Sequence, residues 1–289
     1  MIDHRHGWLG SRVDAKRLFW QAWVPAGSTA GAVVVVHGAA EHGGRYAFVA
    51  EQLGSAGYAT YALDHRGHGR SHGPRALIDR FDHLVEDLRL FVSRVAREHD
   101  GRRPFLLGHS LGGAVALTLA IRSGSDVAGV AVSGPAVATE AVPFAVKAAA
   151  GVLSFVAPRL PVLRIDASAI SRDPEVVRAY EHDPLNHTYR LPARTLAEVM
   201  RSMDRMPRVV GTLRTPLLLL HGSEDRLCPP AGSEMVHSLA TSPDKTLKIY
   251  DGLYHEIFNE PERAQVIGDL VGWIVERTPL TEPREHARS

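Results

Sequence analysis

Short apolar runs and longer amphipathic stretches alternate along most of the chain. Ala32–Val36 and Leu217–Leu220 are continuous apolar runs, as expected for strands that are buried on both faces of a parallel sheet. Between such runs, Leu84, Leu88 and Val95 recur at helical spacing. The other predicted strands are Leu18–Val24, Tyr58–Leu63, Pro104–Leu107, Val127–Val132 and Thr246–Tyr250. This alternation predicts an α/β fold with a mostly parallel, doubly wound sheet.

The alternation stops after the strand that ends near Val132. Residues 136–206 are helical in character and broken by prolines, and they carry no strand signal. An interruption of about seventy residues is long enough to need helices of its own. We therefore predict a core formed by residues 1–135 and 207–289, with residues 136–206 inserted as a helical cap.

A candidate nucleophile lies where one predicted strand meets a predicted helix. The stretch Gly108-His109-Ser110-Leu111-Gly112 has the pattern G-x-S-x-G. It follows the apolar run at Pro104–Leu107 and precedes a helix-forming run. In that strand–turn–helix context the pattern predicts a nucleophile elbow that exposes the serine hydroxyl. The alternative is a glycine-rich turn that happens to contain a serine.

A serine nucleophile needs a base, which in turn needs an acid to orient it. In this type of fold the acid and the base follow the serine in the order Asp or Glu, then His, each after a later strand. The loop after Leu217–Leu220 contains Glu224 and Asp225, and the loop after Thr246–Tyr250 contains His255. We predict Asp225 as the acid and His255 as the base, with Glu224 as the reserve acid.

The oxyanion that forms during acyl transfer needs two prearranged donors. The backbone N–H of Leu111 follows the nucleophile at the start of its helix, and it supplies the first donor. The loop His37-Gly38-Ala39 follows an earlier strand, and we assign the second donor to the N–H of Ala39. Together these residues predict ester hydrolysis by way of an acyl-enzyme.

Composition excludes several other classes of function. The formal net charge is +1, without a basic block of the kind that binds nucleic acid. No histidine pair combines the i, i+4 spacing with the carboxylate that would suggest a zinc helix, so we expect no metal site. Cys228 is the single cysteine, which excludes an internal disulfide, and we interpret it as a small buried filler. The first ten residues lack the apolar stretch of a secretory signal, and no apolar run is long enough to span a bilayer. These features predict a cytoplasmic protein.

Several motifs taken together resemble the monoacylglycerol lipase family, particularly its mycobacterial-type members. They are His37-Gly-Ala-Ala-Glu41-His42-Gly-Gly-Arg45-Tyr46, Asp64-His-Arg-Gly-His-Gly-Arg-Ser71, Gly108-His-Ser-Leu-Gly-Gly113, Gly222-Ser-Glu-Asp225-Arg-Leu, Asp244-Lys-Thr-Leu-Lys-Ile-Tyr250, Gly252-Leu-Tyr-His255 and, in the cap, Ser171-Arg-Asp-Pro-Glu-Val-Val177. The resemblance extends from about residue 19 to residue 275. It implies the α/β-hydrolase fold and hydrolysis of monoacylglycerol to glycerol and a fatty acid, without a cofactor.

The resemblance also concerns the alcohol side of the substrate. It implies that Glu41 and Arg45 lie near the glycerol end, whereas the alternative is an ion pair that only braces the oxyanion loop. Mammalian members have a second histidine three residues after the catalytic one, and Phe258 takes that position here.

The first predicted helix of the cap is unusually apolar. Between residues 141 and 157 the only charged side chain is Lys147. We hypothesise that Phe144, Val152, Leu153 and Phe155 line an acyl tunnel or enter a membrane interface. The alternative is a cap helix that packs only on its neighbours.

Three functions fit the sequence. The first is a monoacylglycerol lipase, and the second is a broader carboxylesterase or lysophospholipase that uses the same residues. The third is a noncatalytic binding protein with a hydrolase fold. The presence of Ser110, Asp225 and His255 together argues against the third function.

Overall fold

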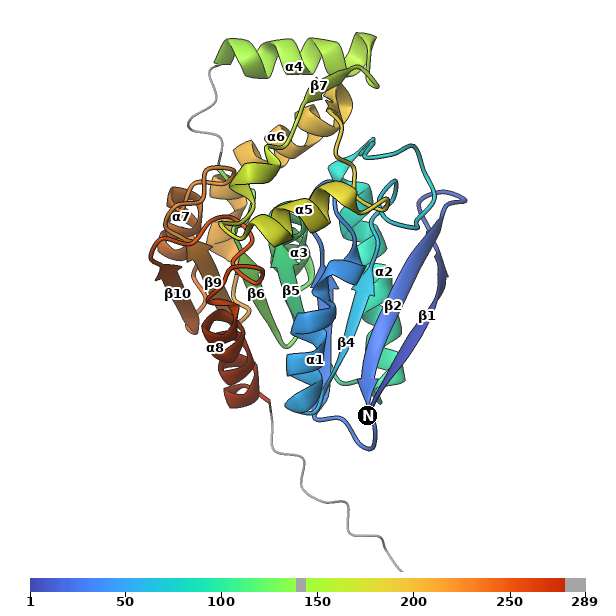
Figure 1. The fold of residues 1–289 in the computed structure, drawn as a ribbon, viewed down its shortest axis with the longest axis vertical. Helices are drawn as coiled ribbons and strands as arrows, with labels where there is room; N and C mark the ends of the chain where they lie inside the picture. The colour runs from blue at the N-terminus through green and yellow to red at the C-terminus, as the bar shows by residue number, and fades with distance from the viewer. Residues whose placement is uncertain (139–143, 279–289) are drawn as a thin grey trace, which may run out of the picture.

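The computed structural model describes residues 1–138 and 144–278. In these ranges, eight strands form one sheet in the order β1-β2-β4-β3-β5-β6-β9-β10 (Figure 1). Their bounds are β1 Ile2–Gly10, β2 Arg17–Pro25, β3 Gly31–Val36, β4 Tyr58–Leu63, β5 Phe105–His109, β6 Gly129–Ser133, β9 Leu217–Gly222 and β10 Lys245–Tyr250. The pairs β1–β2 and β2–β4 are antiparallel, and all the other pairs are parallel. This arrangement confirms the prediction of a mostly parallel α/β sheet.

Helices cover both faces of the sheet and bury two apolar layers. One face packs against α2 Phe81–Glu98, α3 Leu111–Ser123 and α7 Ala231–Leu239. The other face packs against α1 Ala47–Ser55 and α8 Arg263–Glu276, which lie in front of the sheet in Figure 1. Because β3, β5 and β9 are covered on both sides, their continuous apolar runs are explained by burial.

Strand β1 was not predicted from the sequence. Most of its residues are exposed, and its sequence, with His4, Arg5 and His6, lacks an apolar alternation. It is held by antiparallel pairing with β2 along its whole length, and His4 stacks on Trp23 with ring centroids 5.2 Å apart. An edge strand that buries little of itself produces no hydrophobic period, so the sequence pattern could not reveal it.

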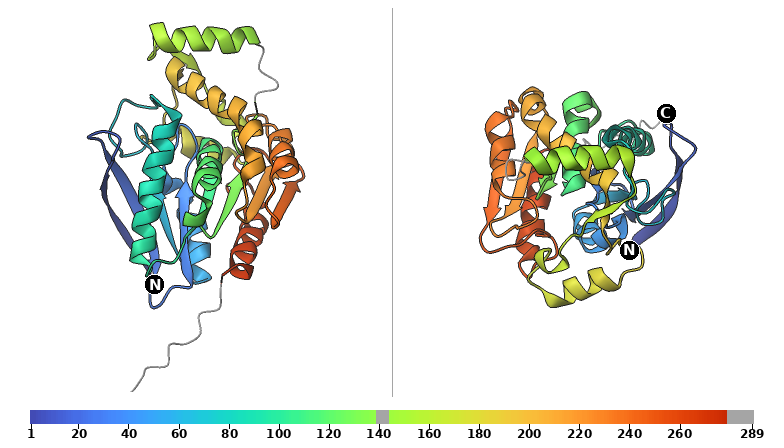
Figure 2. Two further views of the ribbon diagram at one scale, coloured as in Figure 1. Left: turned by 180° about the vertical axis from the view of Figure 1, so that it is seen from behind. Right: turned by 90° about the horizontal axis from the view of Figure 1, so that it is seen from above.

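Between β6 and β9 the described part of the chain leaves the main sheet and forms three α-helices and two short strands, which pair with each other and were not expected from the sequence. The elements of this segment are α4 Phe144–Val156, β7 Pro161–Leu163, α5 Pro174–His182, β8 Leu191–Pro192 and α6 Ala193–Val209. Helix α4 packs on α6 and lies farthest from the sheet, as Figures 1 and 2 both show. Helix α6 therefore lies between α4 and the core.

Candidate active site

The turn after β5 has the backbone geometry of a nucleophile elbow. Ser110 lies between β5 and α3 with φ 52° and ψ −119°, a left-handed conformation that non-glycine residues rarely adopt. A Cβ added to Gly108 would lie 2.6 Å from the carbonyl oxygen of Gly112, and one added to Gly112 would lie 1.9 Å from that of Val36. Both positions therefore require glycine. The strain is held by backbone hydrogen bonds, among them Ser110 N to Ser133 O at 3.0 Å.

The predicted base and acid form a buried pair. His255 Nδ1 donates to Asp225 Oδ2 at 2.7 Å. The other carboxylate oxygen accepts from the N–H groups of Leu227 (2.8 Å) and Cys228 (2.9 Å), which fix its orientation. His221 Nε2 lies 3.1 Å from Oδ2 and adds a third support.

Glu224, the reserve acid, points elsewhere. Its side chain is exposed, whereas Asp225 is 5% exposed. The backbone N–H of Glu224 donates to Leu253 O at 3.0 Å, which ties the loop after β9 to the loop after β10. The structure therefore brings Asp225, and not Glu224, to His255.

The surroundings of Asp225 and His255 keep the acid charged and make the base more basic. Burial opposes ionisation of Asp225, but His255, His221 and the backbone donors together bring the pKa of Asp225 well below its usual value. Burial would lower the pKa of His255, yet the negative charges of Asp225, Glu256 and Glu41 raise it above the ordinary value. The neighbouring imidazole of His109 is different, because burial and the nearby His255 lower its pKa to about 3. His109 stays neutral and does not compete with His255 as a base.

Ser110 and His255 open onto one cavity of about 680 Å³ beneath the cap. Ala39 and Leu111 also line it. The N–H of Gly38 is occupied by the Glu41 carboxylate at 2.6 Å, whereas the N–H groups of Ala39 and Leu111 have no acceptor among the described residues. The two predicted oxyanion donors are therefore unengaged and next to the serine, as the chemistry requires.

Glu41 and Arg45 belong to one buried ionic network. Arg45 Nη1 contacts Glu41 Oε2 at 2.8 Å and Glu256 Oε1 at 2.6 Å, and Nη2 donates to Glu256 Oε2 at 2.7 Å. Tyr46 Oη donates to Glu41 Oε1 at 2.9 Å. Glu41 and Glu256 both line the cavity, whereas Arg45 is not among its lining residues. Arg45 thus braces the oxyanion loop against the loop that carries His255, and Glu41 is the member of the predicted pair that faces the cavity.

Removing Arg45 should chiefly affect stability. In Arg45→Met, two buried carboxylates lose their counter-charge, and we expect the free energy of unfolding to fall by about 3–5 kcal/mol. The matched control is Arg89→Met, because Arg89 pairs with Glu86 at an exposed site and should contribute no more than about 0.5 kcal/mol. Urea unfolding measures both changes. An unchanged unfolding free energy combined with a raised KM would contradict bracing and would favour a direct contact with the substrate alcohol.

The apolar part of the cavity is lined by residues other than the helix α4 residues that the sequence predicted. Its apolar walls come from helix α6, from the segment that runs from β7 towards α5, and from α5 itself. These side chains are Leu163, Ile165, Ile170, Tyr180, Leu196, Val199, Met200 and Met203. The sequence contained a pattern that could have predicted this wall, because Leu196, Val199, Met200 and Met203 follow helical spacing. The prolines elsewhere in the cap made this helix hard to recognise.

The predicted tunnel role of helix α4 is wrong for the residues that the structure describes. Val152, Leu153 and Phe155 do not line the cavity, because α6 lies between α4 and the core. Val152 is 63% exposed and Phe155 is 86% exposed. Phe144 is the first residue of α4, but its side chain lies outside the described part of the structure. The alternative role, in which these residues enter a membrane interface, stays a prediction.

Cys228 lies beside the nucleophile. Its Sγ is 4.0 Å from Ser110 Oγ, and it lines the cavity. Burial, reinforced by the charge of Asp225, raises the pKa of the thiol well above its ordinary value. The thiol therefore stays protonated and is a poor nucleophile.

The described residues form neither a metal site nor a membrane-spanning helix. Within residues 1–138 and 144–278, no cluster of three or more histidine, cysteine, aspartate or glutamate side chains is arranged to hold a metal ion. Across the same residues, no helix has both the length and the apolar character needed to cross a bilayer.

Comparisons with known proteins agree on one family. Residues 27–262 match the family described as serine aminopeptidase, S33. The chain is 43% identical to a monoacylglycerol lipase of Mycolicibacterium smegmatis over 93% of its own length and 96% of the relative's, and 37% identical to human monoglyceride lipase over 92% and 89%. The crystal structure of the Paleococcus ferrophilus monoacylglycerol lipase superposes with a TM-score of 0.81 at 33% identity, covering 90% of this chain and 99% of that one.

Proposed function

The chain belongs to the serine aminopeptidase S33 family and, within it, to the monoacylglycerol lipases, and from this premise we propose how its residues cleave the substrate. It is a serine hydrolase that acts on monoacylglycerols. The observation that carries the proposal is the cavity in which Ser110, His255 and the two free N–H groups meet apolar walls supplied by the cap.

In the first half-reaction, Ser110 becomes acylated. His255 removes the hydroxyl proton as Oγ attacks the ester carbonyl, while Asp225 stabilises the imidazolium. The N–H groups of Ala39 and Leu111 hold the oxyanion of the tetrahedral intermediate. His255 then gives its proton to the leaving oxygen, and glycerol departs from the acyl-enzyme.

In the second half-reaction, water releases the fatty acid. His255 removes a proton from water as its oxygen attacks the acyl carbonyl, and the Ser110 oxygen leaves with the proton that His255 returns. Every step uses groups of this chain and water, so the proposal includes no cofactor.

The two ends of the substrate meet different surfaces of the cavity. We assign the acyl chain to the apolar wall formed by Val199, Met200 and Met203 of the cap, which we take as residues 136–206. We assign the glycerol end to the side bordered by Glu41 and Glu256, whose carboxylates can accept hydrogen bonds from hydroxyl groups. Phe258 is 4% exposed and packs in the core, so we give it no contact with the alcohol.

A substrate panel tests the proposal. Hydrolysis of mono-, di- and triacylglycerol and of a lysophospholipid, all with the same acyl chain, should be fastest for monoacylglycerol. Equal rates on all four substrates would contradict the monoacylglycerol assignment and leave a broad carboxylesterase. A preference for the lysophospholipid would identify that substrate class instead.

We further propose that the cap contacts lipid surfaces, with Phe155 entering the interface. Phe155→Ser should weaken partition onto phosphatidylcholine vesicles at least about tenfold, because burial of a phenylalanine contributes about 1.5–3 kcal/mol. The matched control is Phe48→Ser on α1, far from the cap, where the ring is 37% exposed. Vesicle co-sedimentation and hydrolysis of emulsified long-chain substrate are the measurements. The interfacial role fails if Phe155→Ser matches the wild type in both.

A further inference from the structure

The outer end of the cap combines exposed apolar side chains with cations. Val156 is 67% exposed, and Leu160 and Leu163 are each 44% exposed, alongside Phe155. From residue 144 to residue 165 the charged residues are Lys147, which pairs with Asp204 of α6 at 2.7 Å, and Arg159 and Arg164, and the sequence contains no acidic residue there. An apolar surface with basic residues around it is the composition of segments that bind anionic lipid interfaces.

A cleft of about 450 Å³ lies directly below this end of the cap, at the junction with the core. It is formed by the segment before α2, by the end of α4 and by the start of α6. The lining residues are Leu77, Asp79, Arg80, Ser154, Phe155, Pro158, Arg159 and Arg194. Phe155 thus belongs both to the exposed apolar surface and to the wall of the cleft.

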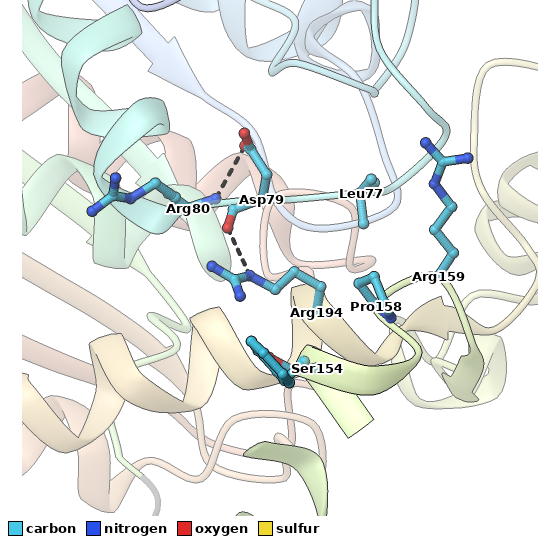
Figure 3. Close-up of a pocket in the computed structure, with 8 residues that line it drawn as sticks. Leu77, Asp79, Arg80, Ser154, Pro158, Arg159 and Arg194 are labelled. Atoms are coloured by element: carbon cyan, nitrogen blue, oxygen red, sulfur yellow. Dashed lines mark hydrogen bonds between the residues drawn. The ribbon is translucent and has the colours of Figure 1, made fainter. Parts of the chain in front are cut away.

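Three arginines extend along the cleft. Figure 3 shows Arg80 and Arg159 at opposite ends, with Arg194 between them. Arg80 and Arg159 are exposed, and neither guanidinium group forms a hydrogen bond or an ion pair with a described residue; Arg80 acts on Asp82 only through longer-range attraction. Arg194 is anchored, since its Nε donates to Asp79 O at 2.7 Å and Nη2 lies 3.1 Å from Glu198 Oε1.

Acidic groups near the cleft are already engaged. Asp79 is paired with His83 at 3.2 Å, and Glu198 is shared between Arg194 and Arg201. A second cleft of about 380 Å³ shares Arg80 and Arg194 and adds Arg201 and Arg205, together with Asp82 and Glu198. Across the two clefts, arginines outnumber carboxylates, and Arg80 and Arg159 are the two whose guanidinium groups form no hydrogen bond or ion pair with a described residue.

From this arrangement we propose that Arg80, Arg159 and Arg194, which we name the arginine strip, dock the protein onto anionic phospholipid bilayers. The proposal rests on the cap contact proposed above and specifies the lipid that it meets. Guanidinium groups spread along a cleft suit a surface that carries many phosphates better than a single small anion. The arginines contact phosphates while Phe155 enters the apolar layer beside them.

The test uses vesicle binding by the Ser110→Ala protein, which keeps binding separate from hydrolysis. Vesicles of phosphatidylcholine alone are compared with vesicles that also contain phosphatidylglycerol. We expect the added anionic lipid to strengthen binding, and Arg80→Gln with Arg159→Gln to weaken binding to those vesicles about 30-fold, at about fivefold per arginine. Raising the salt concentration should remove most of the difference, because exposed charges are screened.

The matched control is the double variant Arg97→Gln with Arg103→Gln. Both arginines are exposed and lack partners in the described part of the chain, and they lie at the opposite end of the molecule, near the start of β5. This variant should bind as tightly as the parent protein. Both double variants should hydrolyse a water-soluble ester at the rate of the protein with Ser110 intact, which shows that folding and chemistry are unaffected.

Two results would overturn the proposal. One is equal binding to both vesicle types, which would indicate an apolar contact without charge recognition. The other is an equal loss in the two double variants, which would indicate attraction by overall charge alone. Neither result bears on hydrolysis, so a failure of the arginine strip is distinguishable from a failure of the proposed enzyme function.

Discussion

Ser110→Ala is expected to lower kcat by about 10⁶-fold, since the loss of a serine nucleophile has an effect of that order. Without the hydroxyl no acyl-enzyme forms, and the oxyanion donors and the cavity alone supply little rate enhancement. Alanine keeps the Cβ of serine, so the strained turn at φ 52° should persist. A dispersed short-chain ester and a stopped assay suit this measurement, because the residual rate will be small.

The matched control for Ser110→Ala is Cys228→Ala. Cys228 is the nearest alternative nucleophile, at 4.0 Å from Ser110 Oγ, and its protonated thiol should contribute nothing to the chemistry. We expect Cys228→Ala to stay within a few-fold of the wild type. Substantial activity in Ser110→Ala that disappears when Cys228 is also replaced would assign the nucleophile to the thiol.

Asp225→Asn should lower kcat by about 10⁴-fold, as loss of the acid does in related constellations. Asparagine keeps the shape but supplies no charge, so it stabilises neither the productive tautomer of His255 nor its imidazolium. Glu224→Gln is the control one residue away, because the Glu224 side chain is exposed and points elsewhere. The acid is misassigned if Glu224→Gln has the larger effect.

The same substitution has a predicted effect on pH dependence. In the wild type, kcat/KM should rise with pH as His255 loses its proton, and the midpoint should lie above the ordinary histidine value because Asp225 and nearby carboxylates raise the pKa of His255. In Asp225→Asn the largest of these attractions is gone and burial dominates, so the pKa should fall and the acid limb should move to lower pH. NMR titration of the imidazole checks the shift directly. If the rise of kcat/KM with pH has the same midpoint in Asp225→Asn as in the wild type, Asp225 does not act on His255.

The parts of the fold that were predicted have local causes. The elbow was recognisable because the glycines on either side of Ser110 are required by close backbone approach, and such a requirement leaves a fixed pattern in the sequence. The central strands were recognisable because burial on both faces demands continuous apolar runs. The pairing of Asp225 with His255 was inferred from the order of the loops along the chain, and the structure places the two side chains together.

The sequence did not predict the cavity wall or the Arg45–Glu256 contact, because both depend on how distant elements pack together. The apolar character of α4 indicated a surface that avoids water, but it could not show that α6 would come between α4 and the cavity. The wall was therefore assigned to Phe155 instead of Met203. Likewise, Glu256 had no pattern that linked it to Arg45, because their contact joins residues 211 positions apart.

Rapid quenching of the reaction with a long-chain monoacylglycerol, followed by peptide mapping, tests the central claim most directly. During the first turnover the account predicts one acyl group on the peptide that contains Ser110, released as fatty acid at the rate of the second half-reaction. The Ser110→Ala protein should carry none. An acyl group found on Cys228, or glycerol and fatty acid released together with no acylated peptide, would contradict the acyl-enzyme on Ser110.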